Sequence, residues 1–184
     1  MLFSPASFAL TLFLLSSATA VPVPDAAAYS DLVVRAPITP ALRGAALNVA
    51  KQIKNKLRPQ PNQAVFWSGM KIGQNGKTTS VKADAQKYAK ANGKETINQA
   101  LAKNNIKIPS PSQNPASSRL WDFASKAWAL RSKGETNAIV GDTRPGSVYN
   151  RIEKPTLIKN PKVNKIVEHD MNKGTSSIVH QKKT

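Results

Sequence analysis

The sequence predicts one domain of the α/β (α+β) class, with a helical N-terminal half and a small, parallel β-sheet in the C-terminal half. Apolar residues recur with the 3.6-residue period of a helix in several segments before residue 134. The segments after it are short and strand-like, namely residues 136–140, 147–152 and 163–167. The 184 residues are enough for a single modest core.

The first twenty residues (1–20) have the pattern of a signal peptide. An apolar run over residues 8–15 precedes Ala18-Thr19-Ala20, whose small side chains suit a signal peptidase. The run is too short to span a membrane, and no second apolar stretch follows it. Residues 21–40 are rich in proline, which indicates an extended leader or pro-segment. We therefore expect a secreted, extracellular protein without a transmembrane segment.

Three helices are predicted in the first half of the domain. Residues 41–57 carry apolar side chains on one side and lysines on the other. Ser80 is a suitable N-cap for a second helix that runs through Asn92. Thr96 and Gln99 form a capping-box pattern, so a third helix begins near Thr96.

Two further elements carry tryptophans. The apolar run 64–67 ends in Trp67 and stops at Ser68-Gly69, which predicts a buried strand entering a turn. In a later helix, capped by Ser118, a stripe with period i, i+4 and i+7 carries two indoles and a hydroxyl. The residues of this stripe are Trp121, Ser125 and Trp128, and those of another apolar face are Leu120, Phe123, Ala127 and Leu130. Two indoles beside a hydroxyl suit a pocket for a flat, cationic, sugar-linked ring.

The single domain is assigned to residues 41–171. Residues 172–184 are basic and polar, and we expect them to form a flexible tail. The formal net charge is +17, from 27 Lys and Arg against 10 Asp and Glu. Such a charge favours anionic partners without choosing among nucleic acid, membrane surfaces and phosphate-bearing metabolites, and a merely solvated surface is the alternative.

Several kinds of chemistry are not predicted. His169 and His180 are the only imidazoles and the chain has no cysteine, so we expect no metal site. A nucleophilic triad is not expected either, because the histidines lie near the C-terminus and no nucleophile elbow is present. Phosphate-cradling and dinucleotide-binding glycine motifs are also absent from the sequence.

Among the acidic residues, Glu153 is the one whose position is least explained by a helix end or a loop. It ends a strand-like run between Arg151 and Lys154, just before Pro155. In this positive field we expect it to stay ionised at neutral pH and to be able to face a developing cation. The alternative is a surface glutamate paired with its basic neighbours.

Four motifs in order resemble the ADP-ribosyl cyclase family, which includes invertebrate cyclases, mammalian ectoenzymes and microbial toxin domains. The resemblance extends from Gln63 to Lys165. The motifs are Phe66-Trp67-Ser68-Gly69, Ala85-x-x-Tyr88-Ala89 followed by Gly93 and Thr96-Ile97-x-x-x-Leu101, Leu120-Trp121-x-x-x-Ser125, and Ser147 to Pro155 with Glu153. The lack of cysteine is similar to the microbial branch.

The resemblance implies roles for individual residues. Trp67 and Trp121 resemble the tryptophans that enclose the nicotinamide end of NAD, and Ser125 resembles the serine beside the ribosyl anomeric carbon. Glu153 corresponds to the catalytic glutamate, which holds the ribose hydroxyls as the glycosidic bond breaks. The other expected substrate-binding residues are Ser68 and Gly69 near the phosphates, together with Asn98 and Tyr149.

The chain also departs from the family pattern. In animal members the glutamate directly follows a Ser-Val pair, where this chain has Tyr149, so Glu153 comes four residues late. Asn98 and Gln99 replace the family's acidic pair, which helps decide between cyclisation and hydrolysis. We therefore expect a secreted NAD glycohydrolase that mainly releases ADP-ribose and nicotinamide, with some cyclic ADP-ribose as the lesser branch.

NAD is expected as substrate, with no cofactor, and use as a toxin or effector is a hypothesis. The second interpretation is a basic ribonuclease-like toxin, for which the charge would serve phosphate contacts. The lack of a central histidine counts against it, so nucleic acid is not the expected partner. A third interpretation is a non-catalytic cationic binding protein, in which Trp67 and Trp121 would be core residues. The sequence does not identify an inhibitor or a target-cell protein.

Overall fold

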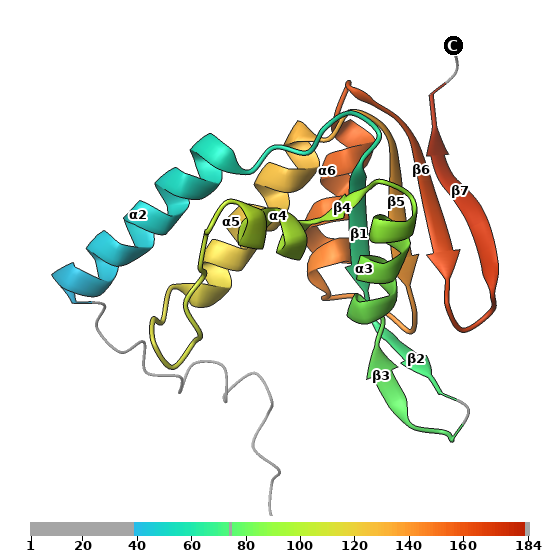
Figure 1. Cartoon of the computed structure of the whole chain (residues 1–184), viewed down its shortest axis with the longest axis horizontal. Helices are drawn as coiled ribbons and strands as arrows, with labels where there is room; N and C mark the ends of the chain where they lie inside the picture. Colours follow the sequence, from blue (N-terminus) through green and yellow to red (C-terminus); the bar gives the residue numbers. More distant parts are fainter. Residues whose placement is uncertain (1–38, 74, 183–184) are drawn as a thin grey trace, which may run out of the picture. The chain divides into compact units, whose positions relative to one another are not determined.

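The computed structural model describes residues 39–73 and 75–182 (Figure 1). The expected signal peptide and nearly all of the expected leader lie outside these residues. Within them, no helix is both long and apolar enough to cross a membrane. The helical elements are α2 (Pro40–Lys56), α3 (Lys82–Ala91), α4 (Ile97–Lys103), α5 (Ser117–Arg131), the short π-helical turn η1 (Tyr149–Glu153) and α6 (Lys154–Lys159). The strands are β1 (Ala64–Ser68), β2 (Met70–Ile72), β3 (Thr78–Ser80), β4 (Glu95–Thr96), β5 (Gly134–Val140), β6 (Val163–Asp170) and β7 (Thr175–Gln181).

The main sheet has five strands in the order β4-β1-β5-β6-β7. The pairs β1–β4, β1–β5 and β5–β6 are parallel, and β6–β7 is antiparallel. The α+β class is confirmed, although the sheet is mixed and two of its strands, β1 and β4, come from the first half of the chain. β2 and β3 form a separate antiparallel hairpin.

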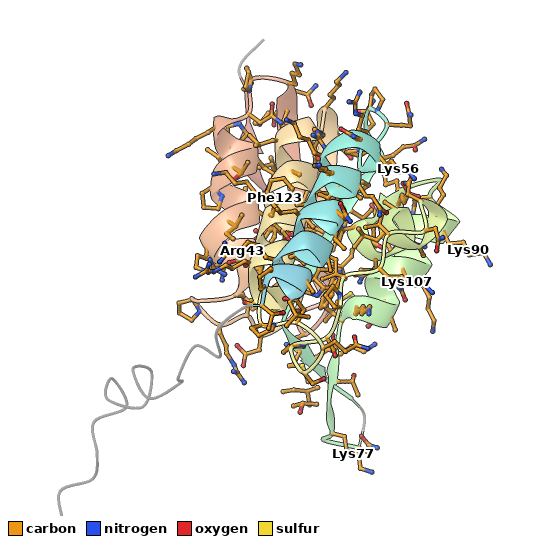
Figure 2. All side chains as sticks on the ribbon, turned by 90° about the vertical axis from the view of Figure 1, so that its left-hand side faces the viewer. Arg43, Lys56, Lys77, Lys90, Lys107 and Phe123 are labelled. Atoms are coloured by element: carbon orange, nitrogen blue, oxygen red, sulfur yellow. The ribbon has the colours of Figure 1, made fainter. Side chains whose placement is uncertain are left out.

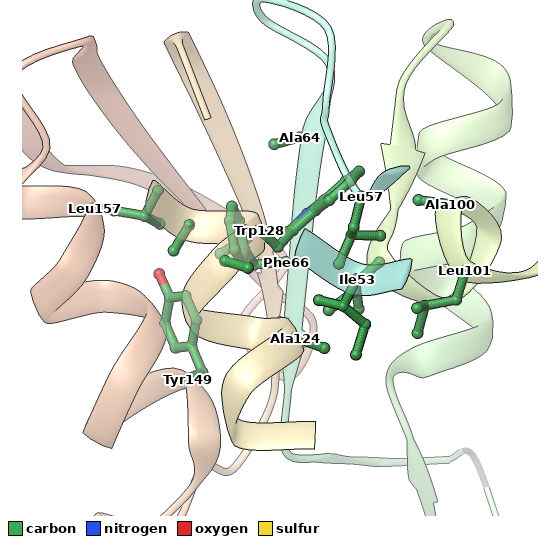
Figure 3. Packing of buried hydrophobic residues seen from close by; sticks show 14 of the residues in the cluster. Ile53, Leu57, Ala64, Phe66, Ala100, Leu101, Ala124, Trp128, Tyr149 and Leu157 are labelled. Carbon is green, nitrogen blue, oxygen red and sulfur yellow. The ribbon is translucent and has the colours of Figure 1, made fainter. Parts of the chain in front are cut away.

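Two apolar clusters hold the layers together. The larger one joins α2, α5, α6 and the sheet, and Figure 3 shows Ile53, Leu57, Phe66 and Trp128 packed within it. The smaller one lies between α3 and the sheet and consists of Val65, Val81, Ala85, Ala89 and Ile139. Because side chains alternate along a strand, Phe66 and Val65 of β1 belong to different clusters. β1 is therefore covered on both faces.

The segment 147–152 is a helical turn, and the predicted strand there is wrong. The Oγ atom of Ser147 accepts a hydrogen bond from the Asn150 amide at 3.3 Å, and the Ser147 carbonyl accepts one from Arg151 at 2.9 Å. Pro155 stands in the first turn of α6, where proline stabilises a helix. Ser147 therefore starts a helical path that continues into α6.

Residues 175–181 form β7, where we expected a flexible tail. The Oδ1 atom of Asp170 accepts hydrogen bonds from the amides of Asn172 and Lys173 at 2.9 and 3.1 Å. Gly174 follows with φ +64°, a conformation that favours glycine. This turn reverses the chain, so the polar residues after it pair with β6 through their backbone.

The tryptophan helix differs from prediction in its start and in its faces. α5 begins at Ser117 after Ala116, and Ser118 does not cap it. Trp128 is fully buried in the larger core, whereas Phe123 is 41% exposed (Figure 2). Leu130, also expected on the apolar face, is 52% exposed. The neighbouring elements, and not the helical period alone, therefore select which side chains of α5 are covered.

The positive charge is spread over the surface. Figure 2 shows Arg43 and Lys56 at opposite ends of α2, and Lys77, Lys90 and Lys107 on other parts of the chain; all five are exposed. Separated, hydrated charges of this kind raise solubility and attract anions over a distance without defining a binding site. The candidate site is therefore identified by a cavity and not by the distribution of surface charge.

Candidate functional site

A cavity of about 440 Å³ opens at the carboxyl end of β1. Parallel strands commonly place ligands at this edge of a sheet. β1 supplies its floor, while α4, α5 and the turn around η1 supply its walls. The lining residues are Phe66, Trp67, Ser68, Gly69, Lys82, Ile97, Asn98, Trp121, Ser125, Ser147, Val148, Tyr149 and Glu153.

All eight residues predicted from the sequence as site residues line this cavity: Trp67, Ser68, Gly69, Asn98, Trp121, Ser125, Tyr149 and Glu153. Trp128 does not line it, because the second half of the predicted stripe on α5 turns into the core. The two indoles of the site therefore come from β1 and α5, and not from one helix.

Trp67 is held in place by α4. Its Nε1 donates a hydrogen bond to the Oδ1 atom of Asn98 at 3.1 Å. The neighbouring Gln99 is used differently, because its Oε1 accepts from the Thr96 amide at 2.9 Å and completes the predicted capping box. Of these two neighbouring amides, Asn98 thus belongs to the cavity and Gln99 to the helix cap.

Glu153 is buried, with 5% of its surface exposed. Burial raises its pKa to about 7, and a hydrogen bond with Ser125, which acts in the opposite direction, does not cancel this effect. Glu153 is therefore not fully ionised at neutral pH, and the expectation that it stays ionised there is wrong. The helical turn η1 causes this, because it directs the side chain inward, away from the solvent and its basic neighbours.

Tyr149 contributes to the cavity wall, but its hydroxyl is already used. It donates a hydrogen bond to the Oε1 atom of Glu168 at 2.8 Å, and Lys154 pairs with the same carboxylate at 2.9 Å. Burial and the nearby Glu168 raise the pKa of Tyr149, so the phenol stays protonated. Tyr149 can therefore shape the cavity and does not act there as an acid or base.

Lys82 lines the cavity and was not predicted from the sequence. It is the first residue of α3, and its amide hydrogen bonds to the Oγ atom of Ser80 at 3.3 Å. Its side chain is exposed and forms no ion pair with the residues of 39–73 and 75–182. The N-cap of α3 is Val81, so the cap predicted at Ser80 is wrong, and Lys82 comes two residues after that serine. Lysine is too common in this chain for this position to stand out in the sequence.

Gly69 lets the chain turn sharply at the edge of the cavity. Its φ is +92°, and a Cβ atom there would come within 2.5 Å of the Asp142 carbonyl oxygen. Gly69 follows β1 and Asp142 follows β5, and the two backbones approach closely here. A side chain at position 69 would therefore force them apart. The described ranges contain no group of three or more His, Cys, Asp or Glu side chains able to hold a metal ion.

No protein-family model matches the chain, and no curated protein matches it significantly. Among solved structures, Aplysia cyclase with substrate NGD and product cGDPR aligns with a TM-score of 0.45 and 19% identity, covering 66% of this chain and 54% of the cyclase. A CD38 structure that concerns a covalent enzyme–substrate complex aligns with a TM-score of 0.45 and 19% identity, covering 70% of this chain and 64% of the CD38 chain. Porcine CD38 with a covalent intermediate aligns with a TM-score of 0.42 and 16% identity, covering 67% of this chain and 69% of the CD38 chain. The chain spans about half the length of the cyclase structures, 54% and 50% in two of them.

Proposed function

We propose that this protein cleaves the bond between nicotinamide and ribose in NAD, releasing nicotinamide and ADP-ribose. The observation that carries the proposal is the meeting of Trp67, Trp121, Ser125 and Glu153 in one cavity. These residues come from β1, α5 and η1 and are separated by up to 86 positions in the sequence. They include each type of group that the sequence resemblance assigns to the reaction.

The chemistry of the cavity fits a pyridinium riboside. Indole faces attract flat cationic rings, and a volume of about 440 Å³ is within the usual range for small-molecule sites. As the glycosidic bond breaks, positive charge passes from the ring to an oxocarbenium-like sugar, which an ionised carboxylate stabilises. Entry of the cationic ring favours the ionised form of Glu153, because an opposite charge nearby lowers the pKa of a carboxyl group.

The rest of the dinucleotide is expected to extend toward Lys82. Glu153 and Lys82 are the charged residues among those that line the cavity, and they come from different elements. NAD has the matching polarity, because its nicotinamide end is cationic and its pyrophosphate is anionic. The backbone at Ser68 and Gly69 borders the same cavity, and we expect the phosphates to lie beside it.

Hydrolysis is the expected main outcome. A neutral amide, Asn98, stands where the family has an acid, and Gln99 is occupied by its helix cap. Secretion, and toxic or effector-like depletion of NAD in a target cell, remain part of the proposal. They rest on the signal-like pattern of residues 1–20, and no cofactor is required.

The test is the release of nicotinamide from NAD by the purified full chain and by Glu153→Gln and Ser125→Ala. We expect Glu153→Gln to lower kcat by about 10²- to 10³-fold, the size of effect seen when a group that stabilises transition-state charge is lost. Glu95→Gln and Ser118→Ala are matched controls outside the cavity and should keep full activity. Intact NAD with the folded wild-type chain, or equal rates for Glu153→Gln and wild type, would overturn the proposal.

A further inference from the structure

A second polar cluster lies on the face of the sheet that α3 covers. It joins Tyr88 of α3, Asn137 of β5, His169 of β6 and Ser176 of β7. His169 and Ser176 are directly opposite each other in the β6–β7 hairpin. Both line a cavity of about 330 Å³ that shares no lining residue with the cavity of Glu153.

The hydrogen bonds fix which nitrogen of His169 carries the proton. Asn137 donates from Nδ2 to the Oε1 atom of Glu135 at 3.3 Å, which orients its amide. The Oδ1 atom of Asn137 then accepts from the Tyr88 hydroxyl at 2.9 Å and faces the Nε2 atom of His169, also at 2.9 Å. Since Oδ1 can only accept, Nε2 must be the protonated nitrogen.

The other ring nitrogen therefore presents a lone pair to Ser176. The Nδ1 atom of His169 lies 2.8 Å from the Oγ atom of Ser176, so the hydroxyl donates to it. Burial lowers the pKa of His169, which favours the neutral ring. A hydroxyl, a neutral imidazole within hydrogen-bond reach and a third group that orients the imidazole are the parts of an activated nucleophile.

We propose that Ser176, His169 and Asn137 form a second, acyl-transfer site for short carboxylic esters. Ser176 Oγ forms a bond to the ester carbonyl carbon while its proton passes to Nδ1 of His169. The bond to the alcohol oxygen then breaks, and the alcohol leaves with that proton. Water cleaves the acyl-serine by the same route, so one ester and one water give one acid and one alcohol.

The cavity is consistent with such a substrate. Ile139 and Met171 give it apolar walls for a short acyl chain, and its charged lining consists of Lys87, Asp84 and Asp170. Ser176 is exposed, so a substrate can reach it. The sequence did not predict this arrangement, because the β6–β7 hairpin that pairs the two residues was expected to be a flexible tail.

The test is labelling of the full chain with an alkyl fluorophosphonate, followed by peptide mass spectrometry, together with hydrolysis of p-nitrophenyl acetate. We expect the label on Ser176, its loss in Ser176→Ala, and unchanged labelling in Ser177→Ala, whose side chain points to the other face of β7. His169→Gln should slow labelling by about 10²-fold or more, the usual contribution of a general base. Circular dichroism checks that each variant is folded.

Labelling that persists in Ser176→Ala, or that falls equally in Ser177→Ala, would overturn the second site, and so would an unlabelled wild-type chain. NAD cleavage is measured on the same samples and should be unchanged in Ser176→Ala. The two sites are therefore tested independently, because either activity can be lost while the other remains.

Discussion

Trp67 of β1 and Asn98 of α4 are joined by a hydrogen bond of 3.1 Å between the indole Nε1 and the amide Oδ1. The bond fixes the orientation of an indole at the cavity and uses the acceptor of Asn98. A carboxylate at this position would accept the same bond and would add a negative charge that Asn98 lacks. Asn98 therefore offers a way to alter the reaction without removing the support of Trp67.

We expect Asn98→Asp to raise the share of cyclic ADP-ribose among the products. One additional hydrogen bond or charge contact worth about 1 kcal/mol changes a partition ratio by about fivefold. The measurement is the ratio of cyclic to linear ADP-ribose by chromatography. Asn98→Ala, which cannot accept from Trp67, is the control and should lower total turnover without raising that share. An unchanged product ratio in Asn98→Asp would contradict the prediction.

Local signals explain what the sequence predicted correctly. The capping box of Thr96 and Gln99 needs only four consecutive residues, and it is present as predicted. Trp121 and Ser125 lie four residues apart on one helix, so their shared face follows from the helical period. The end of β1 at Ser68 follows from an apolar run that stops at a glycine.

Longer-range packing explains the rest. The helical period placed Trp128 with Trp121, but the core around α5 covers Trp128 completely and leaves Phe123 at the surface. Glu153 lines the cavity, but the strand predicted around it is wrong, because an apolar run of this length does not distinguish a strand from a buried turn. Its burial, and hence its raised pKa, depends on the neighbours that the fold supplies.

Glu153→Gln is expected to stabilise the fold at alkaline pH. The pKa of Glu153 is raised from 4.5 to about 7 on folding, so the stability present below pH 4.5 is lost as the pH rises to about 7. The loss amounts to roughly 3 kcal/mol by pH 8 and to less than about 1 kcal/mol at pH 5. Glutamine does not ionise, so the advantage of the variant should grow over this range. Urea unfolding at pH 5 and pH 8 measures it, and an advantage that is equal at both values would show that Glu153 does not titrate in the folded state as proposed.

The same pKa predicts the pH dependence of the reaction. If ionised Glu153 stabilises the developing sugar cation, kcat/KM should rise with pH to a plateau above about 7 and fall about tenfold for each pH unit below it. Because the hydrogen bond from Ser125 lowers this pKa, Ser125→Ala should move the midpoint to higher pH. Initial rates of nicotinamide release between pH 5 and 9 provide the profile. A rate that instead falls as the pH rises through 7 would mean that the protonated form of Glu153 acts.

Lys82→Ala is expected to raise KM for NAD with little change in kcat. A charge-assisted hydrogen bond to a phosphate contributes about 1.5 to 3 kcal/mol, which corresponds to a roughly 10- to 150-fold weaker interaction when it is lost. Nicotinamide riboside has no phosphate, so its KM should be the same for the wild type and the variant. The matched control is Lys77→Ala, which removes the same charge from the exposed turn between β2 and β3 (Figure 2). Lys77 does not line the cavity. If KM rises equally for both substrates, or equally in Lys77→Ala, the loss is one of general charge or of cavity shape, and Lys82 does not bind the pyrophosphate.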